Sequence, residues 1–162
     1  MPRTVWSWAI LAASLALALA VYYGVLGSGL INVIARWTAE WTSVGLNLFG
    51  TETLVRGTIL ASGTFAVNVV AECTSVGPLI LYLGAVIAFP ATVKAKLIGA
   101  ALGVAVLTCI NVFRIMTLFW IGDAYPEYLN IAHLLVWQTA IILLAIVLWL
   151  VWVEKLVGTR NR

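Results

Sequence analysis

The sequence predicts an all-α integral membrane protein. Hydrophobic residues make up 64% of the 162 residues and charged residues only 9%, and the mean hydropathy is +1.10, which excludes an ordinary water-soluble domain. A bilayer core roughly 30 Å thick is crossed by about 20 apolar helical residues. We expect about four transmembrane helices, an interfacial amphipathic helix and a short β-hairpin on the outer side, in a single domain over residues 1–162.

The four predicted spans follow the longest apolar runs, near 6–26, 75–92, 97–121 and 129–153. The first run also resembles a cleavable signal, because Arg3 precedes it and small residues occur near Ala18. We favour a retained helix, since the run is long for a signal and no polar mature domain follows it.

Residues 29–50 predict an amphipathic helix at the membrane interface. Large apolar side chains recur there at helical spacing, at Leu30, Ile34, Trp37, Trp41, Val44 and Leu48. Arg36 and Glu40 lie on the polar side of the same helix. The alternative is a short tilted span through the membrane.

The stretch between this helix and Cys73 reads "TLVRGTILASGTFAVNVVAEC". Phe65, Val67 and Val69 alternate with smaller or polar residues after a break at 61–63. This alternation favours two short strands that form a hairpin.

The distribution of basic residues predicts the orientation, because lysine and arginine are retained on the cytoplasmic side. The basic residues of the N-terminus, of the loop between spans two and three, and of the C-terminus are Arg3, Lys94, Lys96, Lys155, Arg160 and Arg162. An even number of spans places these three regions together. We therefore expect a multi-pass protein of the cell membrane with both termini in the cytoplasm. A formal net charge of +3 gives no indication of nucleic-acid binding.

Three polar residues fall at one depth in this arrangement. Cys73 lies at the outer entrance of span two, and Arg114 lies roughly 10 Å below the outer end of span three. His133, the single histidine, lies roughly 6 Å into span four. We interpret this thiol, guanidinium and imidazole as a candidate catalytic group on the extracytoplasmic side.

Arg114 is the most costly of the three residues to place in a membrane. Inserting an arginine at the centre of a membrane helix costs about 2.5 to 3.5 kcal/mol of free energy even on lenient insertion scales. Asn111, three residues earlier, is placed to orient the guanidinium by a hydrogen bond. The structural alternative is that Arg114 snorkels upward or neutralises Asp123 or Glu127.

The surroundings of Cys73 and His133 contain two further supporting residues. "CTSVGP" combines capping residues, including Ser75, with a first-turn proline, so Cys73 stands near a helix N-terminus that stabilises a thiolate. Asn130 is the nearest group in sequence that could fix the histidine tautomer. The alternatives are an inert Cys73 and a histidine that only packs. Cys109 lies near mid-bilayer, too far from Cys73 for a disulfide.

The motifs "AECTSVGP" and "NVFRI", followed by a histidine in the next span, resemble the exosortase/archaeosortase family of membrane cysteine transpeptidases. The resemblance covers roughly residues 57–153 and is closest to the short exosortase H subfamily. It implies catalytic roles for Cys73, Arg114 and His133. Where many members have Ser-Gly or Asn-Gly after the cysteine, this chain has Thr74-Ser75.

The resemblance implies cleavage of exported proteins that end in a recognition motif, a membrane helix and a basic cluster. A Cys73 thioester would then pass the protein to an envelope acceptor nucleophile of unknown identity. The alternatives are an intramembrane cysteine protease that uses water and a non-catalytic membrane assembly factor. No cofactor is expected, and no metal, because one histidine and one exposed cysteine cannot supply four ligands.

Overall fold

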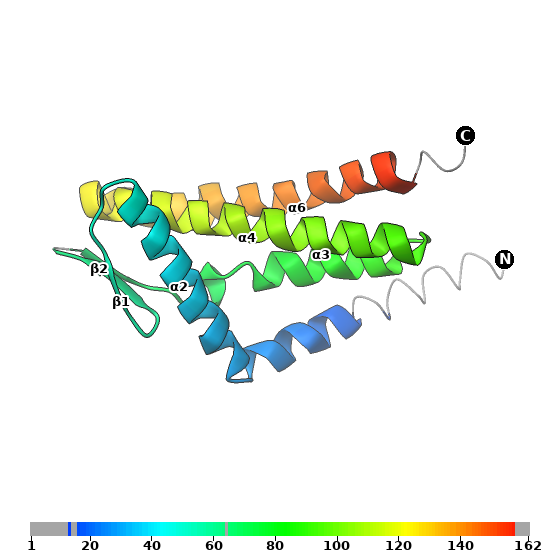
Figure 1. Cartoon of the computed structure of the whole chain (residues 1–162). Coiled ribbons are helices and arrows are strands. Elements are labelled where there is room, and N and C mark those ends of the chain that lie inside the picture. Colours follow the sequence, from blue (N-terminus) through cyan, green and yellow to red (C-terminus); the bar gives the residue numbers. More distant parts are fainter. Residues whose placement is uncertain (1–12, 14–15, 64, 158–162) are drawn as a thin grey trace.

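The computed structural model describes residue 13 and residues 16–63 and 65–157. It is a mostly helical membrane protein with a small sheet at one end (Figure 1). A helix over Ala16–Leu26 leads into the remaining elements. These are α2 (Leu30–Leu48), β1 (Leu54–Arg56), β2 (Ile59–Ser62), β3 (Phe65–Asn68), a 3₁₀ helix (Ala71–Cys73), α3 (Val76–Ala88), α4 (Val93–Ala124), a 3₁₀ helix (Pro126–Tyr128), α5 (Leu129–Ile131), a π-helix (Ala132–Trp137), α6 (Gln138–Trp152) and a second π-helix (Val153–Val157).

Two helical runs among the described residues are long and apolar enough to cross a membrane: α4 and Pro126–Val157, each of 32 residues. Both extend beyond the predicted spans 97–121 and 129–153. Helix α4 begins early because the side chain of Thr92 accepts a hydrogen bond from the Ala95 amide (3.4 Å) and caps it. Part of the predicted span 6–26 lies outside the described residues.

Helix α3 is shorter than the predicted span 75–92. It has 13 residues, a length of about 20 Å at the α-helical rise. It ends at Ala88 because Phe89 precedes Pro90, and Phe89 has an extended backbone (φ −71°, ψ 137°). Alone, α3 falls short of the roughly 30 Å core of a bilayer.

Helix α2 confirms the predicted amphipathic helix and is bent by 77° from Ala16–Leu26. By length and apolar composition, these two helices together could form one broken membrane span or a re-entrant loop. The face of α2 that packs on the protein is mostly small, with Ile31, Ala35, Ala39, Thr42, Ser43 and Leu46 buried. Its large side chains Leu30, Trp37, Trp41, Val44 and Leu48 are exposed and free to face lipid.

The sheet has three antiparallel strands in the order β1-β2-β3, so the prediction of a two-stranded hairpin was one strand short. Val55 pairs with Leu60, and Leu60 pairs with Val67. The turn between β1 and β2 contains Gly57 at φ +66°, a conformation that glycine adopts without strain. The three residues of β1 are too few to show an alternating pattern in the sequence.

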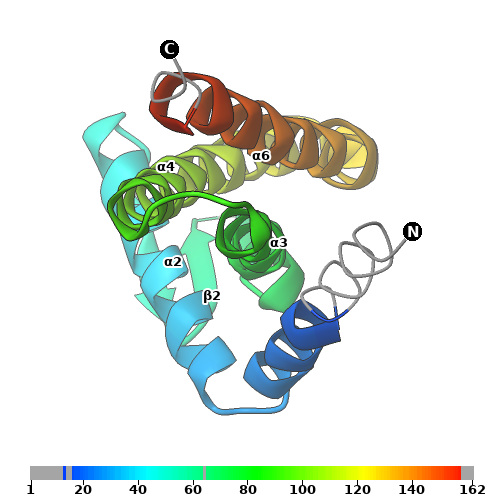
Figure 2. The ribbon, with the colours of Figure 1, turned by 90° about the vertical axis from the view of Figure 1, so that its right-hand side faces the viewer.

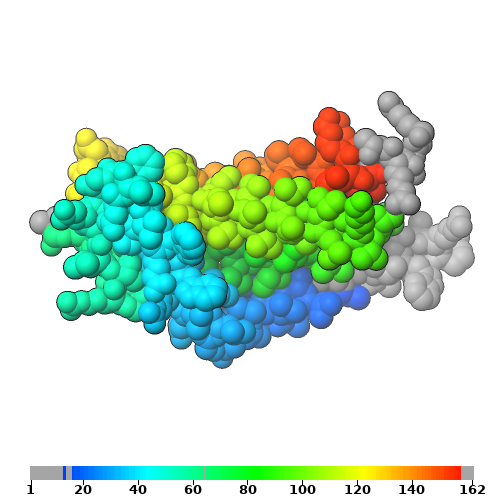
Figure 3. All heavy atoms as spheres, in the orientation of Figure 1, coloured from blue at the N-terminus to red at the C-terminus, as the bar shows by residue number. Residues whose placement is uncertain are grey.

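The sheet and α2 cap one end of the bundle formed by α3, α4 and α6 (Figures 2 and 3). Their shared core contains Leu46, Leu60, Met116 and Phe119. A second core joins the three bundle helices, and within it Tyr82 donates a hydrogen bond from its hydroxyl to Gly99 O (2.9 Å). The chain between the sheet and α3, which carries Cys73, therefore lies between cap and bundle.

Candidate active site

Cys73 is the last residue of the 3₁₀ helix that links the sheet to α3. Its amide donates a hydrogen bond to Val70 O (2.9 Å). Thr74 fixes the next turn, because its hydroxyl donates to Ala71 O (2.6 Å) and accepts from the Val76 amide (3.4 Å). Ser75 occupies the N-cap position of α3 but makes no side-chain capping bond. Of the capping residues that the sequence predicted in "CTSVGP", Thr74 makes the side-chain hydrogen bond to the start of α3.

Asn111 holds the backbone of Cys73 from a separate helix. Its Nδ2 donates a hydrogen bond to Cys73 O (2.8 Å), and its side chain is only 1% exposed. The predicted hydrogen bond from Asn111 to the Arg114 guanidinium is absent. Asn111 Oδ1 is buried and has no hydrogen-bond partner among the described residues. Helix α4 therefore positions the cysteine directly.

His133 lies beside the cysteine, with 4.0 Å between its Nε2 and Cys73 Sγ. It is half-buried and belongs to the π-helix Ala132–Trp137, a rare element that is found frequently at functional sites. Asn130, which the sequence suggested as its partner, is exposed and forms no hydrogen bond with it. The distance is long for a hydrogen bond, as is common at active sites without substrate.

Arg114 is buried inside the protein, with 1% of its surface exposed. It forms no ion pair with a carboxylate of the described residues, so neither structural alternative from the sequence applies. It lies close enough to Cys73 and His133 for their charges to interact. Its Nε and Nη2 are buried without a hydrogen-bond partner in the described chain. Such donors are costly to leave unpaired, which is typical of a site that binds an acceptor.

Two residues near the cysteine were not among the predicted site residues. Thr74 is buried and shapes the turn, and its signal was a threonine two residues before the start of a helix. Glu72 is exposed and lies within electrostatic range of His133. Its signal was a carboxylate adjacent to the cysteine in a chain with few charges.

Cys73 and Cys109 are both free thiols. Within the described ranges no three His, Cys, Asp or Glu side chains are arranged to hold a metal ion. The candidate site therefore consists of the Cys73 thiol, the His133 imidazole and the Arg114 guanidinium, which come from three separate helical segments.

A family model described as transmembrane exosortase matches residues 4–136 of the chain. This range includes the segment from Cys73 to His133. Comparisons with curated proteins and with solved structures found no match.

Proposed function

The chain belongs to the transmembrane exosortase family, and we propose that it is a membrane cysteine transpeptidase that cleaves C-terminal sorting signals from exported proteins. The observation that carries this proposal is the approach of Cys73 Sγ to His133 Nε2 (4.0 Å) beside the buried Arg114. A thiol next to an imidazole is the arrangement of an activated cysteine nucleophile.

The first step forms a thioester between Cys73 and the substrate. His133 accepts the proton of the thiol, and the sulfur attacks the scissile carbonyl carbon to give a tetrahedral intermediate. When the carbon–nitrogen bond breaks, His133 returns the proton to the departing amine. The C-terminal tail then leaves as an intact peptide, and the exported protein stays on Cys73.

Arg114 stabilises the negative oxygen of that intermediate. Its two unpartnered nitrogens are buried donors, and no carboxylate of the described residues competes for them. A donor of this kind typically contributes about 3 to 4 kcal/mol to the transition state. Asn111 supports the same step by fixing the carbonyl group of Cys73.

The second step transfers the protein to an acceptor nucleophile of the envelope. The acceptor attacks the thioester carbonyl, the carbon–sulfur bond breaks, and the cysteine recovers its proton through His133. The site faces the extracytoplasmic side of the cell membrane, and both termini lie in the cytoplasm. The substrate shares the bilayer with the enzyme through the membrane helix of its tail.

The test is processing of an exported protein that ends in a motif, an apolar helix and a basic cluster, taken from the same genome and co-expressed with the full chain. We expect the wild type to shorten it and both Cys73→Ala and Cys73→Ser to leave it intact. A non-catalytic assembly factor would tolerate Cys73→Ser. Normal processing by this variant would therefore contradict the proposal. Cys109→Ser is the matched control and should process normally.

Mass spectrometry of the shortened protein separates transfer from hydrolysis. A new C-terminus that carries an added group supports the transpeptidase. A free carboxylate as the sole product would instead indicate an intramembrane protease that uses water.

A further inference from the structure

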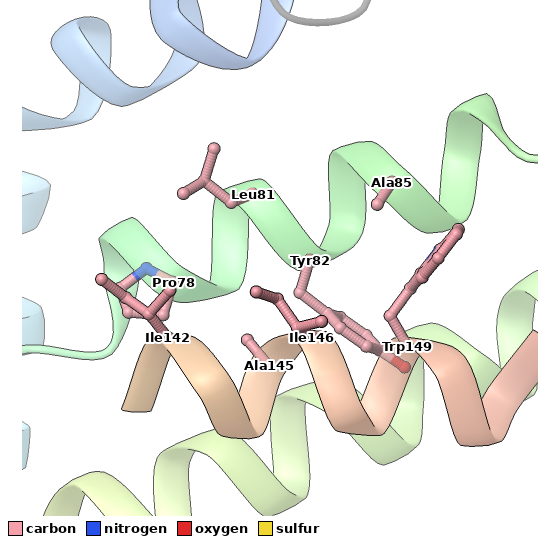
Figure 4. A pocket seen from close by; sticks show the side chains of 8 residues that line it. All are labelled: Pro78, Leu81, Tyr82, Ala85, Ile142, Ala145, Ile146 and Trp149. Atoms are coloured by element: carbon pink, nitrogen blue, oxygen red, sulfur yellow. The ribbon is translucent and has the colours of Figure 1, made fainter. Parts of the chain in front are cut away.

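An apolar groove of about 480 Å³ runs between α3 and α6 (Figure 4). One wall is formed by Pro78, Leu81, Tyr82 and Ala85, and the other by Ile142, Ala145, Ile146 and Trp149. Both sets have the spacing i, i+3, i+4, i+7, so each wall is one face of a helix over two turns. The groove therefore lies between one face of α3 and one face of α6.

The groove leads away from the candidate site. Pro78 lies in the first turn of α3, five residues after Cys73. The opposite wall belongs to α6, which continues the helical run that carries His133. A polypeptide whose scissile bond lies beside Cys73 and His133 can therefore continue along α3 and α6 into the groove.

We propose that this groove holds the membrane helix of the substrate tail, an inference that rests on the proposed function. A helix that lies along α3 and α6 would present the residues just outside the membrane to Cys73. Such docking holds the scissile bond near the nucleophile and makes the attack effectively intramolecular.

The lining favours a helix as the occupant. Helices in lipid associate by close packing rather than by the hydrophobic effect, and small residues at the contact allow a near approach. Ala85 and Ala145 provide this on opposite walls. A third helix fits between two neighbours by the same ridge-and-groove packing that joins α3 and α6.

One polar atom in the groove points to a missing partner. Trp149 Nε1 is buried and has no hydrogen-bond acceptor among the described residues. Trp149 lies at the end of the lining furthest from Cys73, where a passing helix can offer a side-chain or terminal carbonyl oxygen. The other polar group of the lining, the Tyr82 hydroxyl, is already bonded to Gly99 O (2.9 Å).

Photo-crosslinking of the full chain in membranes tests the proposal without requiring catalysis. Benzoylphenylalanine replaces Leu81 or Ile142 in the Cys73→Ala variant. The reporter is the exported protein of the processing test, which ends in a recognition motif, one apolar helix of about 20 residues and a cluster of arginines. The matched control carries the same group at Leu102, an exposed residue of α4 outside the groove. We expect reporter adducts at the two groove positions to exceed those at Leu102 at least tenfold.

Equal adducts at all three positions, or adducts to lipid alone, would overturn the groove as a helix site. Groove adducts combined with a wild type that never shortens the reporter would instead contradict the proposed catalysis. Normal shortening without groove adducts would contradict only the groove. The two inferences therefore fail separately.

A second pair of variants fills the groove. Ile146→Trp adds bulk to the lining, and Val147→Trp adds the same bulk to the next residue of α6, outside the lining; the two side chains are 49% and 53% exposed. We expect Ile146→Trp to slow processing at least tenfold and to remove the adduct at Leu81, while Val147→Trp changes neither. Equal rates for the two variants would contradict the proposal.

Discussion

At the residue scale, Arg114 is the side chain whose burial most needs a functional explanation. It is 1% exposed, two of its nitrogens have no hydrogen-bond partner in the described chain, and no described carboxylate pairs with it. A structural arginine would be held by such partners, since a buried charge without them is destabilising. We therefore interpret Arg114 as the group that binds the negative charge developing on the oxygen of the reacting substrate carbonyl.

This interpretation predicts that Arg114→Met lowers the processing rate by about 10² to 10³, the usual effect of removing one oxyanion donor. The amount of folded protein in the membrane should stay the same or rise, because an unpaired buried charge is removed. The measurements are the single-turnover rate and the yield of protein from membranes. Arg36→Met, which removes only the exposed ion pair with Glu40 (2.8 Å), is the control. Lost yield with an unchanged rate per molecule would assign Arg114 a structural role.

The sequence predicted a common depth for Cys73, Arg114 and His133, and the structure places Cys73 Sγ 4.0 Å from His133 Nε2. The groups that hold these side chains were not predicted. Helical rise alone gave Cys73, Arg114 and His133 a common depth, because rise depends little on packing. The partner of Asn111 could not be predicted, since Cys73 O belongs to a different helical segment. The suggested pairing of Asn130 with His133 rested only on their closeness in sequence, whereas Asn130 is exposed and His133 lies in the π-helix that follows α5.

At the element scale, glycines on α4 determine how closely its neighbours approach. A Cβ atom added to Gly103 would overlap the ring of Tyr82 on α3, and one added to Gly99 would overlap the ring of Trp152. These contacts bring together α3, α4 and the end of α6. The groove proposed for the substrate helix depends on the position of α3 that they set.

We expect Gly103→Ala to destabilise the bundle by about 1 to 3 kcal/mol, the usual cost of overpacking a core. Tyr82 would have to move, and its hydrogen bond to Gly99 O would be strained or lost. Thermal unfolding in detergent measures the change. Gly24→Ala, where the added atom meets nothing within 4 Å, should leave the unfolding temperature unchanged or raise it. Equal unfolding temperatures for the two variants would contradict tight packing at Gly103.

The sequence predicted the type of each long helix more accurately than the residues at which it begins and ends. Long apolar runs predicted α4 and the Pro126–Val157 run, and the helical spacing of large residues predicted α2. The early end of α3 had a local signal in Pro90, which the apolar composition of residues 75–92 outweighed. The outward orientation of the tryptophans of α2 depends on what packs beneath the helix, which composition does not show.

At the scale of the whole molecule, the charges are consistent with one orientation in the membrane. The cap formed by the sheet and α2, the start of α3 and the turn after α4 lie toward one end of the bundle, and the turn between α3 and α4 lies at the other (Figure 1). Lys94 and Lys96 follow that second turn, and Lys155 follows the end of α6. Positive residues mark the cytoplasmic side, so we predict that the cap and the candidate site lie on the extracytoplasmic side.

Labelling of single cysteines in intact cells tests this orientation. In the full chain with Cys73→Ser and Cys109→Ser, we expect Glu52→Cys, an exposed position in the cap, to react with a membrane-impermeant maleimide. Lys94→Cys, exposed near the opposite end, should react only after the membrane is permeabilised. The reverse pattern would place the thiol and imidazole in the cytoplasm, where exported proteins are not yet substrates. Because this result depends on neither catalysis nor docking, it tests the site's location independently of its chemistry.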